Sequence, residues 1–163
     1  MRVYVAAKLE QKDVVRQAYA RLRAAGHEIS HDWTTENSEN ITGLALHSYH
    51  RACAQSDLEG VRNCDALIIL PHRQGKGEWF EMGAAVALGK RVIVVGDPTL
   101  CIFCLLPQVE NTSTLQEAID LISDYPLATA YLHAVYTCPK CGEQRLRQYN
   151  GTFVCISKAC CPW

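Results

Sequence analysis

The segment GKGEWFEMGAA, residues 75–85, combines two features that a site of chemistry requires. Gly75 and Gly77 allow the backbone to approach a ligand closely. Glu81 lies in the first turns of the helix expected here, where the helix dipole favours an ionised carboxylate. Such a carboxylate, facing a cleft, can act as a nucleophile toward an anomeric carbon. The alternative is that Glu78 and Glu81 only complement the dipole on a solvated helix face.

Basic residues flank this glycine-rich loop and could bind an anion. Arg73 and Lys76 lie within the loop, and Lys8 and Lys12 follow the first apolar run of the chain. Ammonium and guanidinium groups beside glycine N–H groups are suited to a phosphate. This pattern favours a nucleotide over a nucleoside as the ligand, unless Arg73 and Lys76 are ordinary surface charges.

A second cluster of polar and aromatic residues follows the second predicted strand. His31, Asp32 and Trp33 could form hydrogen bonds to a nucleobase and stack on it. The alternative for Trp33 is packing in the core, which is the more frequent role of a lone tryptophan.

The cysteines are concentrated at the C-terminal end of the chain. Of nine cysteines, five lie in the last 26 residues. Cys138 and Cys141 form a C-x-x-C knuckle followed by glycine, and Cys155 with Cys160 or Cys161 forms a second pair. This spacing predicts a closed, structural Zn²⁺ site in a zinc ribbon over residues 135–163, with no cofactor needed for catalysis. A disordered thiol-rich tail and a redox module are the alternatives.

Composition narrows the class of protein. A chain of 163 residues can bury one sizeable core, which we expect to form a domain over residues 1–128. The formal net charge of −1 makes nucleic acid an unlikely partner and favours a small molecule. We expect a cytoplasmic protein without membrane association, because no stretch has the pattern of an export signal or of a membrane span.

Hydrophobic periodicity predicts alternating strands and helices. Short apolar runs predict strands at residues 2–7, 27–30, 66–70 and 91–96, with a fifth within residues 100–109. Apolar residues at helical spacing predict helices at residues 13–25, 44–63, 78–88 and 114–123, the last starting with a capping box of Ser113 and Gln116. Residues 31–42 lack an apolar period and are predicted to form a mobile loop.

This alternation predicts an α/β fold with a doubly wound, five-stranded parallel sheet of the Rossmann or flavodoxin-like type. The small zinc ribbon is expected to follow it. In such a sheet, ligands bind beyond the carboxyl ends of the strands. The glycine-rich loop follows a buried strand, so it is expected at that edge.

Three segments resemble the nucleoside 2-deoxyribosyltransferase family, which includes deoxynucleoside 5′-monophosphate N-glycosidases and CMP-type N-glycosidases. The segments are VYVAAK at residues 3–8, SDLEGVRNCDA at residues 56–66 and FEMGAA at residues 80–85. The resemblance implies that Glu81 forms a glycosyl-enzyme intermediate and that Asp57 positions the substrate. An alternative for Asp57 is a solvent-facing helix residue. We expect substrate contacts from Ala6, Lys8, Trp33, Gly75, Lys76, Gly77 and Glu78.

The sequence departs from the family pattern in two places. The loop before the nucleophile carries no carboxylate until Glu78, and the chain continues into the cysteine-rich tail in place of the family's C-terminal asparagine motif. The first departure leaves the recognition of the base open, and the second makes strict base exchange between nucleosides less favoured than hydrolysis of a nucleoside 5′-monophosphate. A non-catalytic nucleotide sensor is an alternative of another class. The resemblance also implies a homodimer or a larger homo-oligomer.

Overall fold

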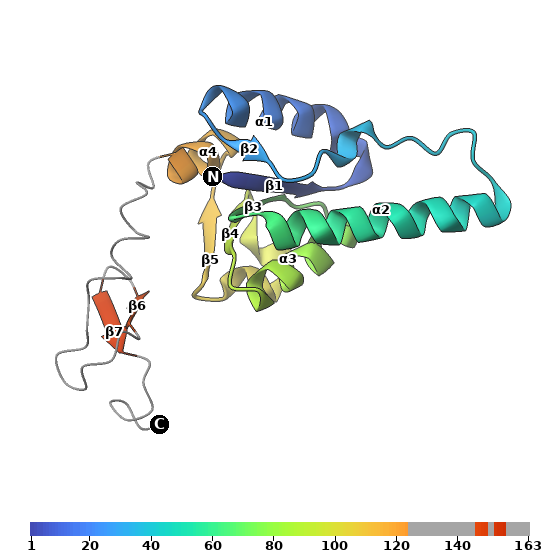
Figure 1. The fold of residues 1–163 in the computed structure, drawn as a ribbon. Coiled ribbons are helices and arrows are strands. Elements are labelled where there is room, and N and C mark those ends of the chain that lie inside the picture. Colours follow the sequence, from blue (N-terminus) through green and yellow to red (C-terminus); the bar gives the residue numbers. More distant parts are fainter. Residues whose placement is uncertain (124–145, 150–151, 156–163) are drawn as a thin grey trace. The chain divides into compact units, whose positions relative to one another are not determined.

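The computed structural model describes residues 1–123, 146–149 and 152–155 (Figure 1). The chain divides into two compact units, Met1–Ile122 and Ser123–Trp163. In the second unit, β6 (Leu146–Tyr149) pairs with β7 (Thr152–Cys155) as an antiparallel hairpin. Cys155 ends β7, whereas the other predicted zinc ligands, Cys138, Cys141, Cys160 and Cys161, lie outside the described residues.

The first unit is built on a five-stranded sheet in which every neighbouring pair of strands is parallel. The order is β2-β1-β3-β4-β5. The strands are β1 (Arg2–Ala7), β2 (Glu28–Ile29), β3 (Ala66–Leu70), β4 (Arg91–Val95) and β5 (Val109–Thr112). This is the flavodoxin-like arrangement, so the predicted α/β class and parallel sheet are confirmed.

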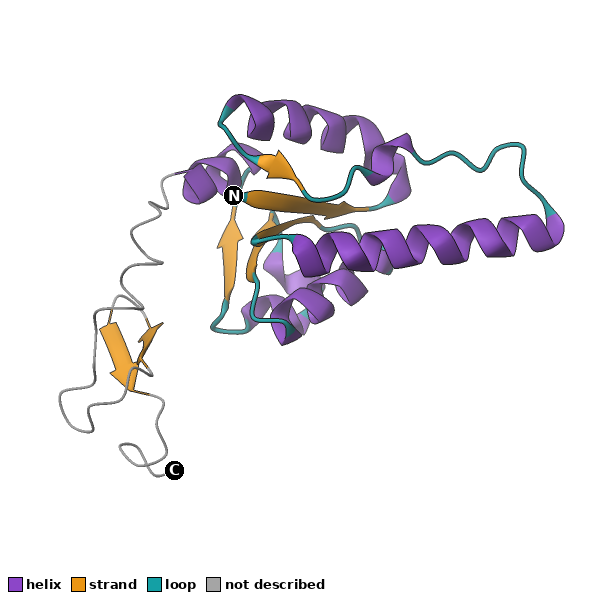
Figure 2. Cartoon of the chain, viewed as in Figure 1, coloured by secondary structure: helices purple, strands orange, loops and turns teal. Residues whose placement is uncertain are grey.

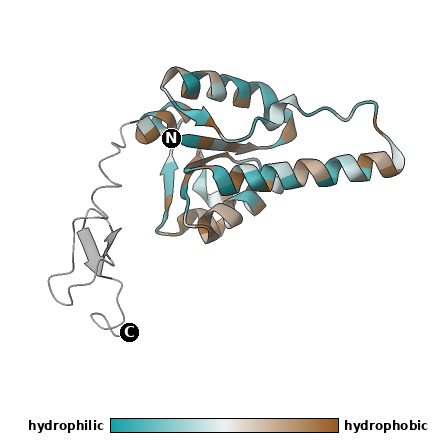
Figure 3. Ribbon diagram, viewed as in Figure 1, coloured by the Kyte–Doolittle hydropathy of each residue, from teal (hydrophilic) through white to brown (hydrophobic). Residues whose placement is uncertain are grey.

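Helices cover both faces of the sheet (Figures 1 and 2). They are α1 (Lys12–Ala24), α2 (Gly43–Asn63), α3 (Gly77–Ala87) and α4 (Leu115–Ser123). Because of this cover, all five residues of β3 are buried, as expected for a continuous apolar strand of a parallel sheet. α3 is apolar along most of its length, whereas α1 and α2 alternate (Figure 3). No described helix has the length and apolar character needed to span a membrane.

The fifth strand is not where the sequence predicted it. Residues 98–105 form two 3-10 turns, η3 (Pro98–Leu100) and η4 (Ile102–Leu105), and β5 begins only at Val109. The prediction was wrong because it took the apolar run to be buried in a strand, whereas Ile102, Phe103 and Leu105 are exposed in η4. An edge strand needs little apolar character, so the polar sequence VENT forms β5.

Two further local predictions need correction. The capping box of α4 uses Thr114 and Glu117 instead of Ser113 and Gln116: the Glu117 amide donates to Thr114 Oγ1 at 3.2 Å, and the Thr114 amide donates to Glu117 Oε2 at 3.3 Å. The segment predicted to be a loop contains a 3-10 turn, η2 (Trp33–Thr35). Its first turn is capped by Asp32, which accepts from the Thr34 amide at 3.2 Å.

One glycine of α2 determines how closely this helix approaches the sheet. A Cβ atom at Gly60 would lie 2.6 Å from His31 Cβ and 2.8 Å from Tyr4 Cε2. Contacts this short do not occur between real carbon atoms, so only glycine allows the observed packing. The close approach presses α2 onto the ring of Tyr4, a residue of β1.

We predict that Gly60→Ala destabilises the protein by about 1–3 kcal/mol, because the added methyl group must displace the Tyr4 ring or the backbone at His31. Gly83→Ala is the matched control. It lies in α3 with no atom within 4 Å of the added Cβ, and alanine favours a helix by up to about 1 kcal/mol over glycine. Chemical denaturation of the two variants measures the difference. Equal stability of both variants would contradict the close packing.

Candidate active site

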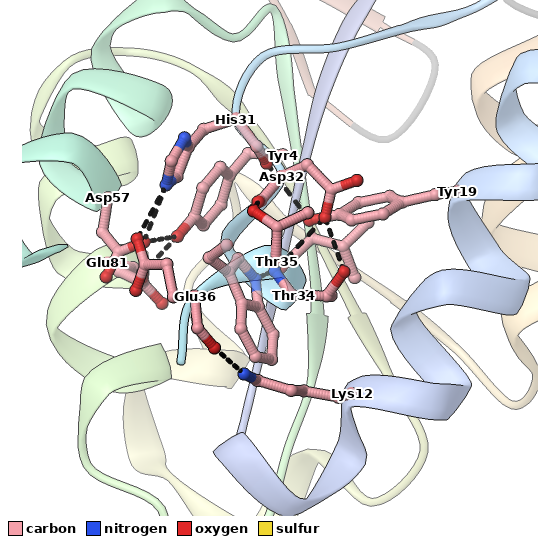
Figure 4. Close-up of polar contacts among 12 residues, drawn as sticks. Tyr4, Lys12, Tyr19, His31, Asp32, Thr34, Thr35, Glu36, Asp57 and Glu81 are labelled. Carbon is pink, nitrogen blue, oxygen red and sulfur yellow. Dashed lines mark hydrogen bonds and ion pairs between the residues drawn. The ribbon is translucent and has the colours of Figure 1, made fainter. Parts of the chain in front are cut away.

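Three elements bring one side chain each to a common point at the sheet edge (Figure 4). Tyr4 comes from β1, Asp57 from α2 and Glu81 from α3. The Tyr4 hydroxyl lies 2.7 Å from Glu81 Oε1 and 2.9 Å from Asp57 Oδ1. The structure therefore brings together the two carboxylates that the sequence singled out, through a tyrosine that it did not.

The hydroxyl of Tyr4 has one proton, although it lies within hydrogen-bond distance of two carboxyl groups. It can donate to only one of them at full strength. The other contact is favourable only if that carboxyl group is itself protonated and donates to the phenolic oxygen. The geometry therefore suits a pair of carboxyl groups that shares one additional proton.

The electrostatic surroundings agree with a shared proton. Burial raises the pKa of Glu81 to about 7, opposed by the hydrogen bond from Tyr4 and reinforced by the negative charges of Asp57 and Glu78. Burial also raises the pKa of Asp57. The pKa of Tyr4 is raised, first by burial and then by the two carboxylates, so its hydroxyl stays protonated. Near neutral pH, one carboxyl group can serve as an acid while the other is ionised.

A cavity of about 190 Å³ opens directly beside the two carboxyl groups. Asp57 and Leu58 of α2 line one wall, and Gly77, Phe80 and Glu81 of α3 line the other. The Phe80 side chain is 69% exposed, so it offers an apolar surface at the rim. A small molecule in this cavity can contact Asp57 and Glu81 at the same time.

The polar network continues beyond Asp57 to residues of the β2–α2 connection. His31 Nε2 lies 3.6 Å from Asp57 Oδ1 and 3.4 Å from Glu36 Oε1, and its ring stacks on Tyr4 with centroids 6.5 Å apart. Within the described residues, His31, Glu36 and Asp57 are close enough to share a metal ion. His31 Nε2 is within hydrogen-bond distance of Glu36 Oε1, whereas its contact with Asp57 Oδ1 is an ion-pair distance.

The glycine-rich loop shows why Gly75 is needed. The carboxyl group of Glu78 lies where a side chain at position 75 would project, and a Cβ atom there would overlap it. Glu78 is buried, and its Oε1 has no hydrogen-bond partner in the part of the chain that the structure describes. Glu78 is therefore a buried neighbour of Glu81 and does not lie on the solvated face considered above.

The other residues expected to bind substrate fall into two groups. Lys8, Lys76 and Gly77 lie at the sheet edge that carries the site, and the Lys8 ammonium donates to Gln74 of the glycine-rich loop at 3.4 Å. Ala6 and Trp33 are buried instead. The Trp33 indole N–H donates to the Val5 carbonyl at 2.8 Å, so Trp33 packs in the core and its ring is not a platform for a base.

The site contains two residues that sequence reasoning did not select. Tyr4 lies in the resembling segment at residues 3–8 without a role of its own there, and Glu36 lies in a stretch predicted to be a mobile loop. The parallel pairing of β1 with β3 was the available signal for Tyr4, because it places the first strand beside the one that precedes the glycine-rich loop. No such signal exists for Glu36.

Comparison with known proteins shows the family of the chain. A family model described as nucleoside 2-deoxyribosyltransferase matches residues 3–117. No curated protein matches the sequence. Among solved structures, CMP N-glycosidase BcmB of Clostridium botulinum is similar with a TM-score of 0.53 and 20% identity, over 77% of this chain and 100% of that chain. At this identity the likeness concerns the fold alone. The match over residues 3–117 shows that the chain is an enzyme of the nucleoside 2-deoxyribosyltransferase family.

Proposed function

We propose that the protein hydrolyses the N-glycosidic bond of a nucleoside 5′-monophosphate through a glycosyl-enzyme intermediate on Glu81. The observation that supports this most directly is the Tyr4 hydroxyl between Glu81 and Asp57, at 2.7 and 2.9 Å. This arrangement places an ionised nucleophile and a neighbouring acid in one cavity. The similarity in fold to a CMP N-glycosidase is consistent with this activity.

In the first step, the Glu81 carboxylate attacks C1′ of the sugar. The bond from C1′ to the base breaks, and its electron pair leaves with the base. Protonated Asp57 supplies the proton that neutralises the departing base, and the Tyr4 hydroxyl then hydrogen-bonds to the Asp57 carboxylate. In the second step, water attacks C1′, its proton passes to Asp57 and Glu81 is released as a carboxylate. The sum of the two steps is hydrolysis.

Base exchange is the second candidate, and the description of the matching family favours it. In that reaction a second base, in place of water, attacks the glycosyl-enzyme. The two reactions share their first step and differ only in the acceptor. A reaction run with and without a second free base separates them, because exchange forms a new nucleoside or nucleotide, whereas hydrolysis releases the free sugar or sugar phosphate.

The surface also supports the homo-oligomer that the family resemblance implies. Exposed apolar side chains lie on η4, which packs near α3, with Ile102 at 76%, Phe103 at 59% and Leu105 at 66% exposure. An apolar cavity of about 320 Å³ lies between these two elements, lined in part by Trp79 and Met82. Exposed apolar surface of this kind is typical of contacts between proteins. We therefore propose that this surface of the first unit takes part in self-association.

We predict that Glu81→Gln abolishes release of the base without unfolding the protein, because the amide keeps the shape of the side chain and removes the nucleophilic charge. Chromatography of a panel of nucleosides and nucleotides detects the free base, and circular dichroism checks the fold. Glu78→Gln, one helical turn earlier, is expected to lose much less activity. If Glu78→Gln were inactive and Glu81→Gln remained active, the nucleophile would lie one helical turn earlier than proposed.

For the unmodified protein, kcat/KM should fall as pH rises through about 7, because the carboxyl pair loses its shared proton and Asp57 can no longer protonate the departing base. Because the Tyr4 hydrogen bond lowers the pKa of Glu81, Tyr4→Phe should move this fall to higher pH. It should also reduce kcat/KM at neutral pH by about tenfold or more. Tyr19→Phe is the control, since that hydroxyl donates to the His31 carbonyl and to neither carboxyl group. If the pH dependence of kcat/KM in Tyr4→Phe matched that of the unmodified protein, Tyr4 would have no part in the mechanism.

A 5′-phosphate should improve the substrate, because Lys76 lies at the start of α3 beside the free N–H groups of its first turn. We expect a nucleoside 5′-monophosphate to have a higher kcat/KM than its nucleoside. Lys76→Ala should lower the ratio of these two kcat/KM values by roughly tenfold, because a charge-assisted contact contributes about 1.5–3 kcal/mol. Lys90→Ala, beyond the far end of α3, should leave it unchanged. Equal kcat/KM for both substrates in the unmodified protein would rule out a phosphate site.

A further inference from the structure

A second cavity, of about 280 Å³, is lined in part by the β2–α2 connection and shares no lining residue with the cavity beside Asp57 and Glu81. Its walls come from three segments: the start of α1 with Lys12, the connection with Glu36, and the middle of α2 with Tyr49 and Cys53. Leu9 adds an apolar surface. The volume is close to the lower end of the range for sites of small ligands, about 300 Å³. The mechanism described above does not use this cavity.

Glu36 joins this cavity to the catalytic carboxyl groups. Its Oε1 lies 3.4 Å from His31 Nε2, which lies 3.6 Å from Asp57 Oδ1. Atoms of Glu36, His31 and Asp57 all lie within 4.8 Å of one another. Figure 4 shows the side chains of Glu36 and Asp57 reaching toward His31 from different segments. A molecule cleaved beside Asp57 can therefore extend one end toward Glu36.

The polar groups of the cavity differ in what they can recognise. An ionised Glu36 carboxylate only accepts hydrogen bonds, whereas the Lys12 ammonium only donates them. The Lys12 ammonium donates to the backbone carbonyl of Glu36, so the two residues lie together. A carboxylate favours the amino edge of a base, such as the exocyclic NH₂ of cytosine or adenine. It is repelled by the keto oxygen at the same position of uracil or hypoxanthine, because both groups are acceptors.

We propose that this second cavity receives the base of the substrate and that Glu36 selects bases with an exocyclic amino group. The proposal rests on the proposed function, because it assumes that the sugar lies beside Glu81. In this proposal, the Glu36 carboxylate recognises the amino group of the base. The glycine-rich loop cannot provide such a carboxylate, since it contains no acidic residue before the buried Glu78.

A larger depression of about 760 Å³ runs along the other side of α2 and also touches His31, but it is less suited to a base. It is more open to solvent, and polar side chains of α2 line most of it. Its one acidic residue, Glu59, already accepts from Asn63 at 2.9 Å and lies 3.7 Å from the Arg62 guanidinium. Glu59 therefore provides a matched control for Glu36.

The test compares CMP with UMP, and dCMP with dUMP, since the members of each pair differ at the amino or keto group of the base. The unmodified protein should have the higher kcat/KM for the amino substrate. Glu36→Gln, which replaces one acceptor oxygen by a donor, should lower kcat/KM for the amino substrate by at least tenfold and reduce or invert the preference. Glu59→Gln should keep the original ratio. A preference for the keto substrate, or a ratio unchanged by Glu36→Gln, would overturn the proposal.

A binding measurement separates this proposal from the proposed function. Isothermal titration of the unmodified protein with free cytosine and free uracil requires no turnover. Cytosine should bind more tightly, and Cys53→Phe, which fills the cavity from α2, should weaken its binding by at least tenfold. Absence of base release from every nucleotide, with cytosine still bound at this cavity, would contradict the hydrolase and leave the base site supported. Equal binding of cytosine and uracil would overturn the base site.

Discussion

A single phenolic proton between two carboxyl groups is the interaction on which the site depends. Water would solvate each carboxylate separately if the three groups were exposed, and the pair would then lose both protons well below neutral pH. Burial changes this, because the charged form of each group becomes costly. Tyr4 stabilises the first negative charge with its hydroxyl, and the second carboxyl group remains available as an acid. The division of the pair into one ionised and one protonated carboxyl group is therefore a consequence of burial.

The packing of the fold maintains this burial. β1 and β3 pair in parallel over Val3 to Ala7, which fixes the level of the Tyr4 side chain beside Leu67 of β3. Gly60 lets α2 approach the Tyr4 ring, and His31 stacks on the ring's outer side. The helix that carries Asp57 is thus positioned by the same aromatic ring whose hydroxyl contacts the Asp57 carboxylate. Tyr4 therefore contributes both to the packing of α2 and to the electrostatics of the carboxyl pair.

Much of the fold was predictable from the sequence because each prediction relied on a strong local signal. The apolar run of β3 and the helix that follows the glycine-rich loop are both found at their predicted places, to within a residue or two. The pairing of Glu81 with Asp57 followed from the family resemblance. The edge strand β5 was misplaced because its burial is slight, and an exposed apolar segment, Ile102 to Leu105, gave the stronger signal.

The sequence could not predict contacts that depend on three-dimensional distance alone. Glu36 lies five residues after His31 in a segment without hydrophobic period, so nothing in the sequence indicates that both meet Asp57. Likewise, nothing in the sequence indicates that the carboxyl group of Glu78 fills the space beside Gly75. Local patterns predict the elements, whereas the contacts between loops require the assembled sheet.

The residues of the site lie far apart in the sequence, and this distance affects when the site forms during folding. The two residues joined by the Tyr4–Glu81 hydrogen bond are 77 positions apart, and Tyr4 and Asp57 are 53 apart. Closing segments of this length costs conformational entropy that only the paired strands β1 and β3 and their covering helices can offset. The contacts of the site therefore require the folded sheet, and Glu81 acquires its raised pKa only when it is buried there.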